Sequence, residues 1–490
     1  MPFDSTDAVR ARAAAAEMIE RYRLPGMAVG VVQGGDLVFS EAFGFADIES
    51  RAPNDPARRH CIASISKTFV GLCAMALVDE GRLSLEARVA ELLPDVRFHG
   101  PDGAMTVRHL LTHTSGIGES PTPEALRKNA IPNLAERPQP GGFDTLYPDG
   151  IIIEPEPGTK WAYANNGYAL LGEIILRAEG VASLQEVIQR RIFGPLEMRD
   201  SDVLGQPHPA LTTPYHRETS EDNRGLLERA GIPVPVESTV DGINIRGRYT
   251  GEFSEAMLAP GGIQSTLSDL ARYATALLRR GNGIVRPETF DAMVAPQWCP
   301  DERFDSWGLS FARAEKFGRR TFGHGGAYPG GWNSSLCVIP ELDLAIIIFM
   351  NIMVDLPGPV FSRIQRAVLG APEESLPELP TDAAVLAGAA GTYLLTMPGR
   401  LTNFRPSTRL GRVVIAAQDG GLRLHSQRGA WKHGARLRPL DPDDPNCFAV
   451  EAPGSDATHI AFIRDESGAV TGLRGDAPGV DLLHMERVDE

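Results

Sequence analysis

Ser64 and Lys67 stand three residues apart in the segment 61–69, whose sequence is CIASISKTF. At a predicted helix start, this spacing brings the two side chains onto one helix face. A serine hydroxyl becomes an effective nucleophile when a base takes its proton, and a lysine can be that base if burial or a nearby cation favours its neutral form. The helix dipole would also favour negative charge developing at Ser64. The pattern predicts a nucleophile with its base; a helix-capping serine beside a solvated lysine is the alternative for this segment alone.

A second polar pair lies in the segment 161–168, WAYANNGY. The phenol of Tyr163 could pass a proton from an attacking hydroxyl to a leaving group, as general base and then general acid. Asn165 offers both a donor and an acceptor, so it could hold Lys67 and a substrate amide together. The alternatives are a buried tyrosine with one satisfied hydroxyl and an asparagine that serves a turn.

A third candidate segment, GHGGA at 323–327, joins a histidine to small residues. His324 could polarise a reacting group or hydrogen-bond Tyr163, although a lone histidine is more often structural. Gly325 and Gly326, on a predicted strand, allow a backbone to approach a substrate closely. We therefore include His324 to Ala327 among the candidate substrate-binding residues.

The helices and strands expected around these residues indicate an α+β domain over residues 1–370. The expected helices and strands follow from hydrophobic periodicity, turns and capping signals. Helices are expected at 6–22, at 69–80 as the continuation of the Ser64 helix, at 169–179, from an N-cap at Ser268 to 280 and at 359–369, and strands at 27–33, 37–45, 307–311, 320–326, 334–339 and 344–351. The two ends would share one antiparallel sheet flanked by helices, with the helical middle as a second lobe. The segments 120–157 and 204–259, which are rich in proline or glycine, are candidate walls of a cleft.

The last quarter of the chain changes character. Residues 371–390 are predicted to be a linker, because their first part is acidic and Pro-rich. Short alternating segments follow, and turns separate them. Examples are 413–417, 422–426, 459–464 and 470–474. We expect residues 391–490 to form a small C-terminal β-barrel of lipocalin-like type.

The composition limits the classes of partner that the protein is expected to bind. With 48 basic and 63 acidic side chains the net charge is −15, and no basic run would follow a phosphate backbone, so neither nucleic acid nor an anionic membrane is expected as a partner. Five scattered cysteines without CxxC spacing indicate neither a disulfide framework nor a zinc site. The N-terminal residues lack a signal-peptide pattern, so a cytoplasmic protein is expected. A small molecule or short peptide is the expected substrate.

The three segments together resemble the serine β-lactamase and penicillin-binding protein superfamily, specifically its class C-like branch. S-x-x-K at 64–67, Y-x-N at 163–165 and H-G-G at 324–326 stand in the order and approximate spacing of its three motifs. Four flanking stretches are also similar to that branch: LLTHTSG at 110–116, PGTK at 157–160, YALLG at 168–172, and PGG at 260–262 with Ser265 and Thr266. The similarity covers about residues 10 to 370.

The resemblance implies a serine hydrolase that works through an acyl-enzyme. Ser64 would be the nucleophile, and Lys67 and Tyr163 would share the proton transfers. The backbone amides of Ser64 and Ala327 would form the oxyanion hole, which contributes about 3–4 kcal/mol per donor to transition-state stabilisation. This chemistry needs no metal and no organic cofactor.

Departures from the family pattern narrow the expected substrate. Class C β-lactamases carry lysine where this chain has His324, which disfavours β-lactam turnover. Gly325 lacks the hydroxyl with which many relatives contact a substrate carboxylate. The pattern is more similar to the D-aminopeptidases and some carboxylesterases of the superfamily, a number of which carry C-terminal β-barrels. A peptidase or amidase of D-aminopeptidase type is therefore the first expectation, and a carboxylesterase the second.

Other classes of protein fit less well. An α/β-hydrolase would need G-x-S-x-G, and a zinc peptidase a pattern such as H-E-x-x-H; neither occurs. A catalytically silent scaffold or sensor has no physical need for the polar cluster of Ser64, Lys67, Tyr163 and Asn165. The C-terminal domain would either cover the cleft or mediate dimerisation, and a homodimer is a candidate assembly.

Overall fold

The computed structural model describes most of the chain in two compact units. The described residues are 2–101, 104–117, 150–154, 156–203, 208–217, 238–240, 243–245, 258–328, 331–354, 357–372, 376–380, 385, 388–395, 410–452, 457–477 and 480–488. The first unit comprises Met1–Trp298, Trp307–Asp355 and Arg363–Gly370, and the second comprises Cys299–Ser306, Leu356–Ser362 and Ala371–Glu490. The predicted walls at 120–157 and 204–259 lie mostly outside the described residues.

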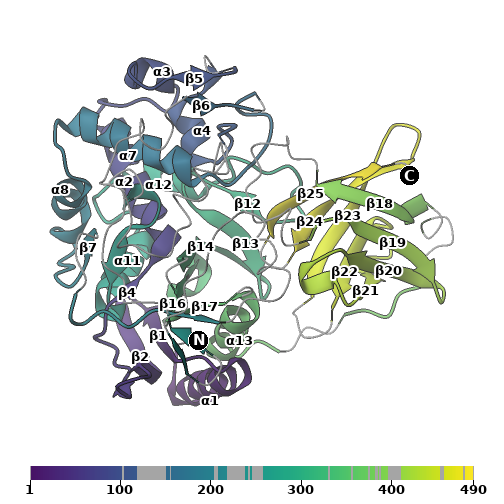
Figure 1. Ribbon diagram of the computed structural model, residues 1–490, viewed down its shortest axis with the longest axis horizontal. Helices are drawn as coiled ribbons and strands as arrows, with labels where there is room; N and C mark the ends of the chain where they lie inside the picture. Colours follow the sequence, from purple (N-terminus) through teal and green to yellow (C-terminus); the bar gives the residue numbers. More distant parts are fainter. Residues whose placement is uncertain are drawn as a thin grey trace. The chain divides into compact units, whose positions relative to one another are not determined.

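Besides its main sheet, the first unit contains helices and short strands (Figure 1), and of the last helix only Arg363–Leu369 belongs to this unit. The helices are α1 (Ser5–Tyr22), α2 (Ser66–Asp79), α3 (Val89–Leu92), α4 (Val107–Leu111), α7 (Asn165–Glu179), α8 (Leu184–Ile188), α10 (Leu258–Gly261), α11 (Leu267–Leu278), α12 (Pro287–Val294) and α13 (Gly358–Leu369), with the 3-10 turns η1 (Ala63–Ile65) and η6 (Pro340–Leu342) and the π-helical turn η4 (Gln189–Phe193). The short strands outside the main sheet are β4 (His60–Cys61), β5 (Phe98–His99), β6 (Ile151–Ile152), β7 (Asp202–Val203), β8 (Tyr215–Arg217), β9 (Ser238–Val240), β10 (Ile243–Ile245), β11 (Ile263–Ser265) and β17 (Ile352–Met353).

The main sheet of the first unit joins both ends of that unit, as predicted. Its strands are β1 (Gly26–Gln33), β2 (Asp36–Asp47), β3 (Ala52–Pro53), β12 (Ser306–Trp307), β13 (Ala312–Lys316), β14 (Arg319–Tyr328), β15 (Trp332–Ile339) and β16 (Leu344–Met350), in the order β12-β13-β14-β15-β16-β1-β2-β3. Strand β1 pairs antiparallel with both β2 and β16, and Met27 stands opposite Met350. Strands β15 and β16 are buried along their whole length. The sequence of β16, LAIIIFM, is apolar throughout, as burial on both faces requires. In β15, the buried polar side chains of Asn333 and Ser334 hydrogen-bond main-chain carbonyls.

Helix α2 forms the centre of the helical region, and all of its residues from Ser66 to Leu77 are buried. It packs against α7, α8 and α10. The approach of α7 to α10 depends on Gly172, because a Cβ there would lie 2.7 Å from the Cβ of Ala259. A helix that is apolar all round must be enclosed in this way, and the enclosure fixes the side chains of its first turn.

Several predicted element bounds differ from the structure. The segment 307–311 is not one strand, because β12 ends at Trp307 and β13 begins at Ala312. Helix α7 begins at Asn165 rather than at residue 169. The N-cap of α11 is Thr266, whose hydroxyl accepts a hydrogen bond from the Asp269 amide, so the prediction of Ser268 as the cap is wrong. The last two differences lie at helix starts, where neighbouring polar residues compete for the same role.

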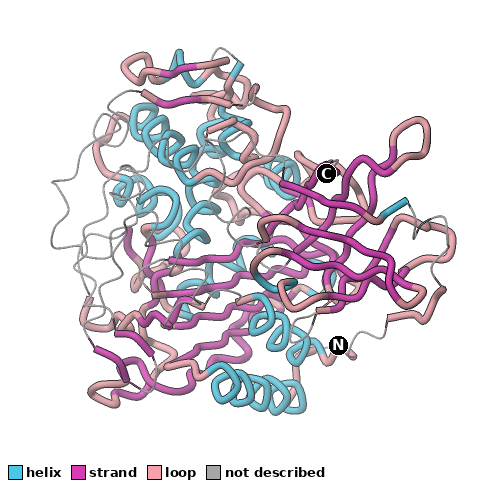
Figure 2. The backbone as a smooth tube through the Cα atoms, turned by 45° about the vertical axis from the view of Figure 1, so that its right-hand side comes forward, coloured by secondary structure: helices cyan, strands magenta, loops and turns pink. Residues whose placement is uncertain are grey.

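The second unit contains a closed barrel, which confirms the predicted β-barrel (Figure 2). Its strands are β18 (Gly391–Leu395), β19 (Val413–Gln418), β20 (Gly421–Ser426), β21 (Ala435–Pro439), β22 (Cys447–Glu451), β23 (Thr458–Arg464), β24 (Val470–Ala477) and β25 (Val480–Val488), with the 3-10 turn η7 (Gly429–Trp431) after β20. Strand β18 pairs with both β19 and β25 and so closes the barrel. Along β20, Leu422 and Leu424 are buried while Arg423 and His425 are exposed, the alternation that a small barrel needs.

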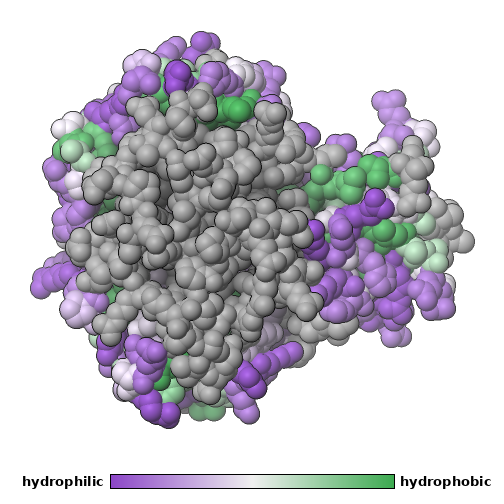
Figure 3. Space-filling view, viewed as in Figure 1, coloured by the Kyte–Doolittle hydropathy of each residue, from purple (hydrophilic) through white to green (hydrophobic). Residues whose placement is uncertain are grey.

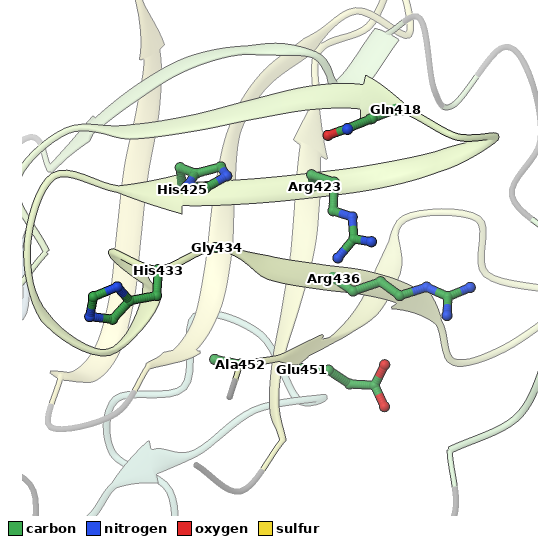
Figure 4. A pocket seen from close by; sticks show the side chains of 8 residues that line it. All are labelled: Gln418, Arg423, His425, His433, Gly434, Arg436, Glu451 and Ala452. Carbon is green, nitrogen blue, oxygen red and sulfur yellow. The ribbon is translucent and has the colours of Figure 1, made fainter. Parts of the chain in front are cut away.

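On the face seen in Figure 3, the coloured residues of the barrel include many hydrophilic side chains with some apolar ones between them. A surface pocket of about 530 Å³ lies on the barrel. Figure 4 shows the lining residues Gln418, Arg423, His425, His433, Gly434, Arg436, Glu451 and Ala452. None of them belongs to the predicted site. No helix within the described ranges is long and apolar enough to cross a lipid bilayer.

Candidate active site

Ser64 is the middle residue of the 3-10 turn η1, and this turn ends directly before the first residue of α2. The predicted Ser64 helix is therefore a tight turn that carries Ser64, followed by an α-helix that carries Lys67 in its first turn. The residue before Ser64, Ala63, has a φ of 48°, in the left-handed region that residues other than glycine seldom adopt. Strained backbone of this kind is concentrated at functional sites, where the surrounding structure holds it in place.

Lys67 is completely buried, and its amine lies within hydrogen-bond distance of three polar groups on the serine turn, α7 and α10. Nζ lies 3.0 Å from Ser64 Oγ, 2.8 Å from Asn165 Oδ1 and 2.7 Å from the carbonyl oxygen of Pro260. The two amide oxygens can only accept. A neutral amine, with two N–H groups and one lone pair, would donate to both of them and accept from the Ser64 hydroxyl. A charged ammonium would donate to all three. The geometry thus accommodates Lys67 before and after it takes a proton.

The acceptors of Lys67 come from two helices packed on α2. Asn165 is the first residue of α7, and Pro260 lies in the short helix α10. Because α2, α7 and α10 contact one another, both oxygens are fixed by helix packing. Satisfied partners matter here, since a buried amine without them would carry a large desolvation cost.

Tyr163 lies in the irregular segment that precedes α7, and its ring is buried. Lys67 Nζ lies 4.9 Å from the centroid of the Tyr163 ring, within the range of a cation–π contact. The main chain on both sides of Tyr163 is held: the Ala162 amide donates to the His113 carbonyl at 2.8 Å, and the Ala164 amide donates to His113 Nδ1 at 3.1 Å.

The H-G-G motif lies on β14, which runs beside η1. His324 is buried, and its Nδ1 lies 2.5 Å from the Gly325 carbonyl oxygen. A carbonyl can only accept, so this nitrogen carries a proton. The ring centroid of His324 lies 6.1 Å from that of Tyr163. Gly325 is exposed, Gly326 is buried and Ala327 is partly buried.

Gly326 permits the close approach of β14 to the segment before Ser64. A Cβ at Gly326 would lie 2.1 Å from Ser334 Oγ and 2.3 Å from the Ile62 carbonyl oxygen, whereas a Cβ at Gly325 would meet nothing nearer than 3.9 Å. The Ser334 hydroxyl also donates to the Ile62 carbonyl at 2.8 Å. The structure therefore brings the serine turn, the lysine helix, the tyrosine segment and β14 into one region of the first unit.

Comparison with known proteins agrees with this arrangement. The β-lactamase family model matches residues 11–370. The chain belongs to the β-lactamase family.

Two relatives and one solved structure are similar to this β-lactamase family member over most of its length. A D-aminopeptidase from Brucella canis is 25% identical over 483 residues, which cover 96% of this chain and 76% of that protein. A D-aminopeptidase from Cereibacter sphaeroides is 28% identical over 448 residues, covering 86% and 77%. The structure of the octameric penicillin-binding protein homologue from Pyrococcus abyssi is 21% identical with a TM-score of 0.60, covering 98% of this chain and 100% of that one, and shows the same fold. The chain is a serine hydrolase of the β-lactamase family.

Some residues of this site had no separate signal in the sequence. His113 stands in the LLTHTSG stretch that resembles the family, but nothing in the sequence links it to Tyr163, whose ring it contacts. Trp161 and Trp307 surround the same histidine, with ring centroids 5.9 and 5.0 Å from it. The Pro260 carbonyl is a main-chain group, so the residue type at that position does not indicate its role as an acceptor. Among the residues that the structure describes, no group of three or more His, Cys, Asp or Glu side chains is placed to hold a metal ion.

We expect Gly326→Ala to lower the stability and the activity of this β-lactamase family protein, and Gly325→Ala to leave both nearly unchanged. The new methyl group at Gly326 would overlap Ser334 Oγ and the Ile62 carbonyl, and overpacking of this kind costs about 1–3 kcal/mol. Relief of the overlap must move β14 or the Ser64 turn. We therefore expect a lower melting temperature and lower activity for Gly326→Ala. Equal melting temperatures and activities for the two variants would contradict this account.

Proposed function

We propose that this enzyme hydrolyses D-aminoacyl amides and short peptides with an N-terminal D-residue, through an acyl-enzyme on Ser64. The observation that carries the proposal is the 3.0 Å contact of Ser64 Oγ with a completely buried lysine amine. The D-aminopeptidase relatives, which cover most of the chain, support the substrate class.

Acylation begins with the loss of the Ser64 hydroxyl proton. Neutral Lys67, whose two N–H groups are held by Asn165 and Pro260, takes that proton while Ser64 Oγ bonds to the substrate carbonyl carbon. The carbonyl oxygen becomes an oxyanion. As the C–N bond breaks, Tyr163 donates a proton to the leaving nitrogen and is reprotonated from Lys67. The amine leaves and an ester of Ser64 remains.

Deacylation reverses the same transfers with water as the nucleophile. Lys67 and Tyr163 remove a proton from water, the hydroxide oxygen bonds to the acyl carbon, and Ser64 leaves with a proton restored. In this scheme the Ser64 and Ala327 amides stabilise both oxyanions, each by about 3–4 kcal/mol. His324 contributes polarity beside Tyr163.

The H-G-G motif favours substrates that have no carboxylate beside β14. Gly325 is exposed on β14 and has no hydroxyl for a substrate carboxylate, and His324 occupies the position of a lysine in class C β-lactamases. Amides and esters are both cleaved through a tetrahedral intermediate, so the hydrolysis of an ester would use the same groups of the enzyme. The cytoplasmic location and the homodimer expected from the sequence stay predictions.

The test combines covalent labelling with a matched substrate panel. Purified enzyme is treated with a fluorophosphonate and with a penicillin, and its intact mass and labelled peptide are determined. D- and L-alanine p-nitroanilides and p-nitrophenyl butyrate are then compared. We expect one fluorophosphonate adduct, on Ser64, and a kcat/KM for the D-anilide at least about tenfold above that for the L-anilide, equivalent to about 1.4 kcal/mol.

The other outcomes separate the alternatives. Turnover of the ester without either anilide would favour the carboxylesterase. Preference for the L-anilide would contradict the D-specificity. A complete lack of adduct and turnover would favour a silent scaffold.

A further inference from the structure

His113 binds the main chain on both sides of Tyr163. Its carbonyl oxygen accepts from the Ala162 amide at 2.8 Å, and its Nδ1 accepts from the Ala164 amide at 3.1 Å. Because the two hydrogen bonds flank Tyr163, they restrict the backbone rotations that would move the phenol.

The imidazole of His113 also lies against the Tyr163 ring. The two ring centroids are 4.2 Å apart and the planes are inclined by 30°. The Lys67 amine lies 4.9 Å from the Tyr163 centroid. His113 thus restricts the Tyr163 ring itself, while its hydrogen bonds restrict the main chain.

The hydrogen bonds define the protonation of His113. Nδ1 accepts from a backbone amide, so it carries a lone pair, and in a neutral ring the proton must be on Nε2. Nε2 is buried and has no hydrogen-bond acceptor among the described residues. The nearest rings to the imidazole, besides Tyr163, belong to Trp307, Tyr168 and Trp161, with centroids at 5.0, 5.1 and 5.9 Å.

The surroundings keep this ring uncharged. Burial, followed by repulsion from Lys67 on α2 and His324 on β14 whenever these groups are protonated, holds the pKa of His113 well below its usual range. Among the described residues, the other titratable groups that face the ring are the phenols of Tyr163 and Tyr168, and burial raises the pKa of Tyr168 far above its usual value. Protonation at Nδ1 would remove the acceptor of the Ala164 amide.

We propose that His113 is a positioning residue for Tyr163: its backbone carbonyl and its neutral imidazole each accept a hydrogen bond from one neighbour of the tyrosine, and the imidazole packs against the phenol ring. The proposal rests on the proposed function, in which Tyr163 transfers protons. A displaced phenol would transfer them slowly, and a shift of about 1 Å in a reacting group can reduce the rate about a hundredfold.

Two substitutions separate the contacts. His113→Asn keeps a short side chain with an acceptor oxygen but removes the ring. Asparagine also tolerates the φ of 58° found at His113. His113→Phe keeps a ring for stacking and removes the acceptor of the Ala164 amide. Both variants retain the backbone carbonyl that accepts from the Ala162 amide.

His60→Asn is the matched control. His60 is also buried in the first unit and stacks on Phe349, with centroids 4.9 Å apart. Burial lowers its pKa to about 3, so it is neutral as well. Its Nδ1 lies 3.3 Å from Thr212 Oγ1, and it is not part of the proposed machinery. It therefore reports what the loss of a buried, stacked, neutral histidine does to the fold alone.

The experiment measures kcat and KM from pH 5 to 10 for the full-length enzyme and the three variants, with melting temperatures. For both His113 variants we expect kcat to fall about 10- to 100-fold, KM to change less than about threefold, and the midpoint of the pH–kcat profile to shift. His60→Asn should lower the melting temperature without moving that midpoint. An unchanged kcat and pH profile in both His113 variants would overturn the proposal.

A second measurement reads the tautomer without activity. In wild-type protein labelled with 15N-histidine, we expect long-range proton–nitrogen spectra to show His113 with an unprotonated Nδ1 and a protonated Nε2 from pH 5 to 9. A proton on Nδ1 in that range would overturn the proposal even if the variants fail to fold. Absence of both adduct and turnover in the wild type would instead refute the proposed function, and with it the reaction that His113 serves.

Discussion

Replacing Ser64 by alanine is expected to remove the fluorophosphonate adduct and to lower kcat/KM by about 10⁵–10⁶-fold. The proposed reaction passes through a bond between Ser64 Oγ and the acyl carbon, and loss of the nucleophile in a serine hydrolase costs about this much. The fold should survive, because the deleted hydroxyl leaves Lys67 two acceptors, on Asn165 and Pro260. Intact mass, turnover of the D-anilide and thermal melting are the measurements.

Ser66→Ala is the matched control for that substitution. Ser66 is two residues further along and completely buried, and its Oγ accepts a hydrogen bond from the Ile263 amide at 3.1 Å. Its removal should leave kcat/KM within about threefold while costing about 1–3 kcal/mol of stability, because a buried amide loses its acceptor. An adduct that persists in Ser64→Ala would place the nucleophile elsewhere and refute the proposal.

Replacing Lys67 by methionine should lower kcat/KM by about 10³–10⁴-fold, the upper part of the range for general acid–base catalysis. Methionine fills the space of the lysine stem but can neither take the Ser64 proton nor donate to Asn165 and Pro260. Two amide oxygens lose a donor, at roughly 1–3 kcal/mol each, while the cost of burying an amine disappears. We therefore expect a large kinetic effect with a small change in melting temperature.

The kinetic loss is to be compared with that of Lys316→Met. Lys316 is exposed at the end of β13, so the same change of side chain there should leave kcat/KM within about twofold. Pre-steady-state labelling with the fluorophosphonate tests the acylation step directly. If Lys67→Met labels as fast as the wild type, another group activates Ser64, and the assignment of Lys67 as base is wrong.

The fold class followed from the sequence because its signals are local and repeated. Apolar runs such as 344–350 and 27–33, at opposite ends of the first unit, have the composition of doubly buried strands, and they are neighbours in the sheet. The alternation of buried and exposed residues along β20 (421–426) recurs in the first residues of β19 and β21. The contact of Ser64 with Lys67 also followed from sequence spacing alone.

The details of the candidate site depend on contacts that spacing does not encode. The acceptor from Pro260 is a main-chain atom brought to Lys67 by the packing of α10. The 3-10 turn at Ser64 begins with a positive φ at Ala63, and alanine is not a residue type that indicates such a backbone conformation. His113 is about fifty residues from Tyr163 in sequence, so only the folded chain reveals that their rings touch. Close approach at Gly326 was expected, but toward a substrate rather than toward Ile62.

The pairing of β1 with β16 has a consequence for the order of events during synthesis. Met27 and its partner Met350 are about 320 residues apart, which a ribosome producing about 5–20 residues per second needs roughly 15–65 s to make. Throughout that time β1 has β2 beside it but an open edge on its other side, and such edges attract other chains. Non-local pairing of this kind also slows folding. The nascent chain must therefore keep an apolar strand apart from its neighbours until the last strands of the first unit emerge.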